Sequence, residues 1–499
     1  MTEPTALTRR RRLLILAICC LSLLIVGLDN TIVNVALPAI QRDLHAPASG
    51  LQWVIAAYTL VLASLLILSG SVADRIGRRR IFQIGLLLFV LGSLLCSIAP
   101  SLGWLIAFRA VQAIGGSMLN PVAMSIITNV FTDPRERAQA IGVWGGVVGI
   151  SMALGPVVGG LLVDSYGWPS IFLINIPIGL LAIVLAARFV PESRAPKPRR
   201  LDPVGQLLAI VALGAGTATI IEGPGQGWTS PGILTLAVIA LAALTAFPLW
   251  ERSRREPLLD LRFFRSAPFS GATVIAVCAF ASLGGFLFLN TLYLQDVRHY
   301  SPVTAGLWTL PIAAFTLVCA PISGRIVGSR GPRLPLLIAG PALAASGALL
   351  TRLTDTSPAA LLLVAYSLFG LGFGLVNAPI TNAAVSGMPR AQAGVAAAVA
   401  STSRQVGQSL GVAVIGTVVT AAVVGPLATG LAPASHAGWW IITALGLVIA
   451  LLGVLTTTGW ARGTADRVAA RLDPTDPTDP AASPPVRPAV RPVRSDRLR

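Results

Sequence analysis

The feature that most constrains this chain is a succession of long apolar runs separated by short polar segments. Each run is about 18 residues or longer and contains few charged residues, which is typical of helices that span a membrane. Fourteen such runs occur, at residues 13–37, 51–71, 81–99, 104–128, 141–163, 170–190, 204–222, 231–250, 269–290, 303–323, 334–352, 358–380, 398–424 and 437–459. The sequence therefore predicts an all-α integral membrane protein.

The composition argues against the soluble classes of protein. Charged residues make up 11% of the 499-residue chain, whereas soluble domains carry about 25%. The formal net charge of +17 comes mainly from short segments between the runs, so we expect no surface that binds nucleic acid. The five cysteines lie inside apolar runs without metal-ligand spacing, which predicts neither a disulfide framework nor a metal site.

The basic residues between the runs predict the orientation of the chain. An even number of spans places both termini on one side of the membrane, and the loops on that side hold most of the arginines. The opposite loops hold only a few, such as Arg42, Arg298 and Arg352. By the positive-inside rule, both termini are expected to be cytoplasmic, in a multi-pass protein of the cell membrane.

A repeated sequence pattern divides the runs into two halves. Residues 69–79 follow the second run and residues 323–333 follow the tenth, and both segments begin Ser-Gly and carry another glycine seven residues after the first. Parallel halves of this kind are typical of secondary transporters. We expect a basic N-terminus at 1–12, six-helix bundles at 13–190 and 269–459, two inserted helices within 191–268, and a disordered Pro/Arg-rich tail at 460–499.

Asp29 is the only charged residue between Leu13 and Leu37, so a carboxylate lies within the first span. An ionisable group in the hydrocarbon core costs at least about 2.5–3.5 kcal/mol, and such a residue is a functional candidate by default. Arg109 lies in the outer half of the fourth span, as Asp29 does in the first, and Gln112 shares its helical face. We expect Asp29 and Arg109 to meet; the alternative is that Arg109 extends to the outer interface.

The segment between the second and third runs holds the most specific motif. Gly70 and Gly77 allow a short turn to pass close to a neighbouring helix, and Asp74 can face a helix N-terminus or a cation. Arg75 and Arg78 are expected to face the cytoplasm and its anionic lipids. A purely topogenic role would explain the arginines but not the glycines and the aspartate at this spacing.

This segment resembles the signature between helices 2 and 3 of the major facilitator superfamily. Further resemblance, to the fourteen-helix drug:proton antiporter subfamily, lies in the first-helix motif Leu28–Pro38, the fourth-helix motif Arg109–Gly116 and the fifth-helix exporter motif Gly155–Gly160. The sequence departs from these patterns at Ala113 and Ser151, where glycine is usual, and at Pro169, where arginine is common. The resemblance covers nearly the whole chain and implies the major-facilitator fold.

The resemblance also implies a function, which is proton-coupled efflux of drugs or other amphipathic small molecules by alternating access. The proton gradient is the energy source, and no cofactor is implied. In the family, the fourth-helix arginine, here Arg109, influences the protonation of a nearby acid, for which Asp29 is the candidate. Glu222 ends the seventh span and is either an interfacial residue or a second proton carrier.

The fifth span carries Gly155, Pro156, Gly159 and Gly160. Glycines four residues apart allow another helix to approach closely, and the proline permits a bend. The resemblance implies a gate between the two halves, and static tight packing is the alternative.

Five amide residues are candidates to line a substrate cavity because polar side chains are rare in the spans. They are Asn34, Gln112, Asn290, Asn377 and Asn382. Asparagines also pack membrane helices through hydrogen bonds, so a structural role is the alternative for each.

Other functions have less support in the sequence. No Gly-x-x-x-x-Gly-Lys-Ser/Thr loop occurs, which argues against ATP as the direct energy source. No constellation of a nucleophile and a base is visible, so we do not expect an enzyme. A dedicated exporter of one antibiotic or secondary metabolite, a channel and a non-transporting receptor or scaffold are the alternatives. The expected partners are the lipid bilayer, an amphipathic small molecule and protons, with no obligate protein partner.

Overall fold

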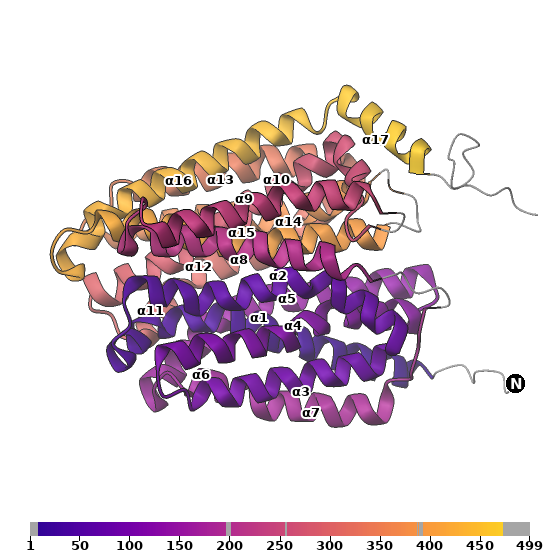
Figure 1. Ribbon diagram of the computed structural model, residues 1–499, viewed down its shortest axis with the longest axis horizontal. Coiled ribbons are helices and arrows are strands. Elements are labelled where there is room, and N and C mark those ends of the chain that lie inside the picture. The colour runs from indigo at the N-terminus through magenta and orange to yellow at the C-terminus, as the bar shows by residue number, and fades with distance from the viewer. Residues whose placement is uncertain (1–7, 196–200, 255–256, 387, 389–392, 473–499) are drawn as a thin grey trace, which may run out of the picture.

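The computed structural model describes residues 8–195, 201–254, 257–386, 388 and 393–472. Within these residues, fourteen helices are long and apolar enough to cross a membrane, which confirms the predicted number of spans. Figure 1 shows these helices running roughly alongside one another, with the start of α1 and the helix α17 at the same end of the molecule. We call this end the terminal end and the opposite end the far end.

The first bundle consists of six spans. Its helices are α1 (Arg9–Leu44), α2 (Ala48–Ile76), α3 (Arg78–Ser97), α4 (Leu102–Val130), α5 (Pro134–Tyr166), α6 (Ser170–Leu173) and α7 (Asn175–Phe189), of which the last two form one span. Local signals fix several of these boundaries. For example, Asp133 accepts hydrogen bonds from the main-chain nitrogens of Arg135 and Glu136, and Pro134 occupies the first helical position of α5. Helix α1 already begins at Arg9, so the described part of the predicted basic N-terminus belongs to this helix.

The second bundle repeats this arrangement. It contains α10 (Ala267–Leu292) with the π-helical turn η2 (Tyr293–Val297), α11 (Pro302–Trp308), α12 (Leu310–Arg330), α13 (Arg333–Leu350), α14 (Ala359–Val385), α15 (Ala393–Ala422) and α16 (Leu427–Leu455). Helices α11 and α12 together form one span. The second bundle therefore also has six spans.

The turns that follow α2 and α12 confirm the repeated sequence pattern. Gly77 ends α2 with φ +133° and Gly331 ends α12 with φ +83°, a backbone region that favours glycine. The segment from Gly70 to Arg80, which we expected to be a loop, is helical apart from Gly77. A single glycine reverses the direction of the chain here, so the turn needs no additional loop residues.

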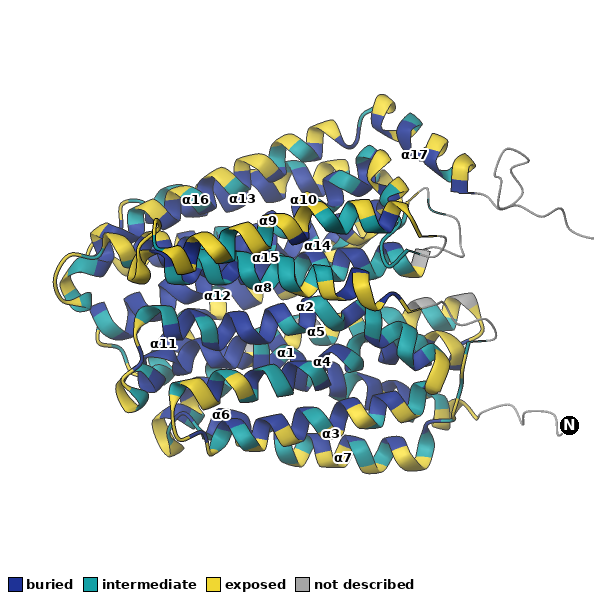
Figure 2. Ribbon diagram, viewed as in Figure 1, coloured by how far each residue is buried: buried dark blue, intermediate teal, exposed yellow. Residues whose placement is uncertain are grey.

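The two inserted helices lie beside the seam between the bundles. They are α8 (Pro203–Gln226) and α9 (Pro231–Arg252), followed by the short 3₁₀ helix η1 (Leu261–Arg265). Helix α8 contacts both bundles, because Thr417 Oγ1 in α15 donates to the carbonyl of Ile220 in α8 at 3.2 Å and Trp53 Nε1 in α2 donates to Glu222 Oε1 in α8 at 2.7 Å. Helix α9 packs on the outside of α8 and is mostly exposed (Figure 2).

The prediction of a disordered tail at 460–499 was wrong for its first part. Residues Gly459–Leu472 form the helix α17, which packs against α10 and η1. Its buried residues recur at helical spacing, and they are Ala461, Thr464, Ala465, Val468 and Leu472. This spacing supplies the apolar face that a disordered tail would lack. Residues 473–499 lie outside the described residues.

The distribution of burial matches a protein surrounded by lipid. Large apolar side chains such as Val184, Leu241 and Leu447 are exposed on the outer helices. In contrast, the interior holds buried polar groups, among which are Asp29 and Arg109. An apolar exterior around a partly polar interior is expected when the surrounding solvent is hydrocarbon.

Candidate functional site

Asp29 and Arg109 meet in the interior of the first bundle. Asp29 in α1 is 0% exposed and Arg109 in α4 is 1% exposed. Arg109 Nη1 lies 2.5 Å from Asp29 Oδ2, so the two side chains form a buried ion pair. The expected meeting is therefore observed, and Arg109 does not extend to the interface. A buried charge of either sign is costly without its partner, so each side chain compensates the other.

Three polar side chains complete the site around the carboxylate. Gln112 Nε2 donates to Asp29 Oδ1 at 2.8 Å, and Asn175 Nδ2 donates to the same oxygen at 3.2 Å. Gln112 Oε1 accepts from Arg109 Nη1 at 2.7 Å, so this amide bridges both members of the ion pair. Ser93 Oγ in α3 lies 2.8 Å from Gln112 Nε2. Side chains from four helices, α1, α3, α4 and α7, thus form one hydrogen-bonded network that includes the carboxylate.

Helix α2 holds the guanidinium from the other side. Arg109 Nε donates to the carbonyl of Val54 at 3.2 Å, and its guanidinium carbon lies 4.1 Å from the ring centre of Tyr58. A cation over an aromatic face is stabilised, more so where water is excluded. The hydroxyl of Tyr58 is buried and has no hydrogen-bond partner among the described residues.

Sequence reasoning missed Ser93, Asn175 and Tyr58. Each lies in an apolar run, where a polar side chain is unusual. Asn175 in particular stands near the start of the sixth run, and the rule that selected the other asparagines applies equally to it.

The glycines of α5 lie where this helix meets its neighbours. A Cβ on Gly159 would lie 3.2 Å from the carbonyl oxygen of Ile32 in α1, and Gly155 faces Thr31, which also lies in α1. Gly160 faces the second bundle, where an added Cβ would lie 2.7 Å from Cα of Val303. The exporter motif therefore makes both the packing of α5 on α1 and its contact with α11.

The contacts between the two bundles gather at the far end. There, Val303 N donates to Asp164 Oδ2 at 3.2 Å and Gln295 Nε2 donates to the carbonyl of Val35 at 2.8 Å. Nearer the terminal end, a Cβ on the glycines of α5 and α12 would have no neighbour within 4 Å; these are Gly142, Gly145, Gly146, Gly324 and Gly328. The described bundles thus touch at the far end, and these glycines nearer the terminal end face open space.

The motif around Gly77 is covered by the segment that follows α7. Asp74 Oδ1 accepts from Arg78 Nη2 at 2.9 Å, so this carboxylate faces a cation, one of the two expected situations. Glu192 Oε1 accepts from the main-chain nitrogen of Arg79 at 3.1 Å, at the N-terminus of α3. Gly77 allows this approach, because an added Cβ would lie 2.7 Å from Glu192 Oε1. Gly70 packs near α4, because an added Cβ would lie 3.8 Å from Cβ of Pro121.

Arg75 belongs to the same motif and lies exposed near the end of α2. No further role for it follows from its position.

Glu222 lies in α8 at the far end and is not among the partners of Asp29. Its Oε1 accepts a hydrogen bond from Trp53 Nε1 at 2.7 Å, and Gln226 Nε2 lies 3.4 Å from its Oε2. The side chain is half-buried. This position is more typical of a residue at the membrane interface than of a member of the Asp29 site.

The amide residues expected to line a cavity do not gather in one place. Gln112 belongs to the Asp29 site, and Asn34 donates to the carbonyl of Asn30 on its own helix at 3.3 Å. Asn290 accepts from the hydroxyl of Tyr366, and both are buried.

The remaining two amides lie in α14. Asn377 donates to the carbonyl of Phe373 at 3.4 Å, whereas Asn382 is exposed at the terminal end. Their assignment to a substrate cavity stays a prediction.

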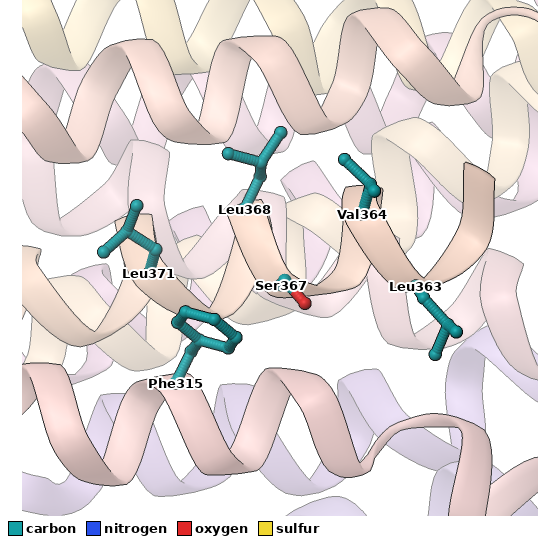
Figure 3. A pocket seen from close by; sticks show the side chains of 6 residues that line it. All are labelled: Phe315, Leu363, Val364, Ser367, Leu368 and Leu371. Atoms are coloured by element: carbon teal, nitrogen blue, oxygen red, sulfur yellow. The ribbon is translucent and has the colours of Figure 1, made fainter. Parts of the chain in front are cut away.

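A pocket of about 290 Å³ lies between α12 and α14 (Figure 3). Among the described residues that line it, Ser367 is the only polar one, and Phe315, Leu363 and Val364 are exposed apolar residues. None of the candidate residues lines it. Apolar exposed surface of this kind is expected to face lipid.

The model of the Major Facilitator Superfamily matches residues 19–412. The multidrug resistance protein Stp of Mycobacterium tuberculosis is 39% identical over 412 residues, which are 83% of this chain and 76% of that protein. The puromycin resistance protein pur8 of Streptomyces alboniger is 38% identical over 475 residues, 93% of each chain. The solved structure of the peptide transporter POT in complex with sulfate shares the fold, with a TM-score of 0.65 at 17% identity over 92% of this chain and 95% of that one.

Proposed function

Because the chain belongs to the major facilitator superfamily and its relatives are drug resistance and efflux proteins, we propose that it exports drugs or other amphipathic small molecules in exchange for protons. It is a multi-pass membrane transporter and not an enzyme. The observation that carries proton coupling is the buried ion pair of Asp29 and Arg109. Both termini face the cytoplasm, as the basic loops indicate.

Asp29 carries the proton in this mechanism. Close contact with Arg109 favours the ionised carboxylate, and a buried carboxylate that loses its cation favours the neutral acid. A conformational change that moves α1 relative to α4 therefore makes Asp29 take up or release a proton. One charge that crosses 100 mV supplies about 2.3 kcal/mol, enough for roughly fifty-fold accumulation of a neutral substrate.

The gate lies where α5 meets α11 at the far end. The bundles touch there through Gly160 and Val303, whereas Gly145 and Gly324 face open space. This arrangement suits a conformation that is open toward the cytoplasm. Rocking of the bundles about the Asp29 site would close the terminal end and separate α5 from α11.

A dedicated exporter of one antibiotic is the second candidate. It is favoured by the puromycin resistance protein, which matches this chain over 93% of both lengths. Both candidates use the same site and differ only in the range of substrates.

Purified protein in liposomes with an imposed pH gradient tests the proposal. An exchanger accumulates substrate only while the gradient lasts, and a protonophore abolishes accumulation. Substrate flux that ignores the gradient would indicate a channel, and absence of flux for every compound of a broad panel would indicate a receptor or scaffold. Saturation by one compound alone would favour the dedicated exporter.

A further inference from the structure

A pocket rich in arginine lies at the terminal end of the second bundle. It has a volume of about 150 Å³, and its lining includes Arg330 at the end of α12, Arg333 at the start of α13 and Arg462 in α17. All three arginines are exposed. The lining also includes the buried apolar side chains of Leu336 and Ile380. The pocket thus combines a positive opening with an apolar interior.

The described part of the chain provides no carboxylate in this pocket. None of the described residues that line it is acidic, and none of the ion pairs among the described residues involves its three arginines. The sequence has no Asp or Glu between Asp355 and Asp466. Asp355 follows the end of α13 that is opposite to Arg333, and Asp466 is exposed on α17.

The corresponding place in the first bundle does contain a carboxylate. Gly77 there corresponds to Gly331 in the repeated sequence pattern, and both glycines end a helix with positive φ. Glu192, which follows the sixth span, accepts from the main-chain nitrogen of Arg79 and lies 3.8 Å from Nε of Arg80. An anion from the chain itself therefore lies at this turn.

In the second bundle, the segment that follows the sixth span supplies an arginine instead. This segment is α17, and it brings Arg462 to the pocket beside Gly331. Among the described residues, the same turn thus has an internal anion in one bundle and, in the other, arginines that form no ion pair. An anion bound in this pocket would restore the equivalent balance of charge.

We propose that this pocket binds the phosphate group of an anionic phospholipid. Arg330, Arg333 and Arg462 contact the phosphate, and the adjoining apolar part of the lipid lies against Leu336 and Ile380. A lipid is favoured over a free phosphate ion because the pocket has this apolar interior. It also lies at the ends of several spans, and Trp460, two residues before Arg462 in α17, is 68% exposed, as is common at a membrane interface. The inference does not depend on the proposed transport function.

Binding of phosphatidylglycerol to the purified full-length protein in detergent, followed by native mass spectrometry, tests this site. The variant R330Q/R333Q is expected to bind phosphatidylglycerol about 25-fold more weakly, roughly fivefold for each arginine. R325Q is the matched control, because Arg325 lies on the same helix near the same end but does not line the pocket. Equal affinities of R330Q/R333Q and the wild type would overturn the proposal.

A second variant keeps the test decisive if the double variant fails to fold. N382D places a carboxylate in the lining of the pocket with almost no change of shape. It is expected to weaken phosphatidylglycerol binding, while the Tm in lipid-free detergent stays equal or rises. Unchanged binding in N382D would contradict the site. If inorganic phosphate at millimolar concentration displaced phosphatidylglycerol and stabilised the protein equally, the ligand would be a free ion and not a lipid. Phosphatidylcholine, which has no net charge, should bind no better to the wild type than to N382D.

Discussion

Gly306 in α11 packs directly against the main-chain carbonyl of Pro156 in α5, so the two bundles touch backbone to backbone at the far end. Gly160 makes the reciprocal contact with Pro302 and Val303. Such close approach is possible only without side chains. The contact between the bundles at the far end therefore depends on glycines that are supplied by both bundles.

Replacement of Gly306 by valine should disfavour the closed far end. Overpacking costs about 1–3 kcal/mol, which corresponds to roughly a 5- to 150-fold change in a conformational equilibrium. We expect accessibility of far-end cysteine probes to rise and the transport rate to fall. Gly324→Val is the matched control in the same span, because an added Cβ there has no neighbour within 4 Å. Equal accessibility of the probes in both variants would show that the contact does not hold the far end closed.

Replacement of Arg109 by glutamine should destabilise the protein. It leaves the buried carboxylate of Asp29 without its cation, a change that costs about 3–5 kcal/mol. We expect a lower Tm in detergent and a partial recovery in the double variant Asp29→Asn/Arg109→Gln. Arg109→Lys should fold better than Arg109→Gln but lose transport, because lysine cannot reproduce the separate contacts with Gln112 and Val54. Full transport by Arg109→Lys would show that charge alone is sufficient.

Glu222→Gln should leave proton-driven transport close to that of the wild type. Glutamine keeps an oxygen that accepts from Trp53 Nε1, and Glu222 has no contact with the Asp29 site among the described residues. The ratio of protons to substrate, measured in proteoliposomes, checks this expectation. A lower ratio in the variant would identify Glu222 as a second proton carrier.

Gly77→Ala should lower the Tm more than the same change at another glycine with positive φ. An alanine with this positive φ is strained by about 1–3 kcal/mol, and its Cβ also meets the carboxylate of Glu192. Gly425→Ala provides the comparison, because Gly425 also has positive φ, +82°, but no neighbour within 4 Å of the Cβ position. Thermal unfolding of both variants isolates the effect of Glu192, and identical losses of Tm would exclude it.

The fold was predictable because lipid requires long apolar helices, so the number of spans can be counted in the sequence. The repeated glycines at 77 and 331 likewise revealed the two halves. The contact between Asp29 and Arg109 was predictable because a buried charge needs a partner. Ser93 and Asn175 were missed because hydrogen bonds between helices depend on their rotation, which apolar runs do not specify. Helix α17 was missed because the proline-rich residues after it dominated the composition of the tail.

Glu192 was also not predictable from the sequence alone. It is one of several charged residues in a polar segment, and only the structure shows that this segment folds back onto Gly77.

In the proposed mechanism, Asp29 couples the proton gradient to efflux. Proteoliposomes with Asp29→Asn, which preserves the shape of the side chain, test it most directly. We expect the variant to equilibrate substrate down its gradient but to lose accumulation driven by an imposed pH gradient. Accumulation equal to that of the wild type at every pH would contradict the claim.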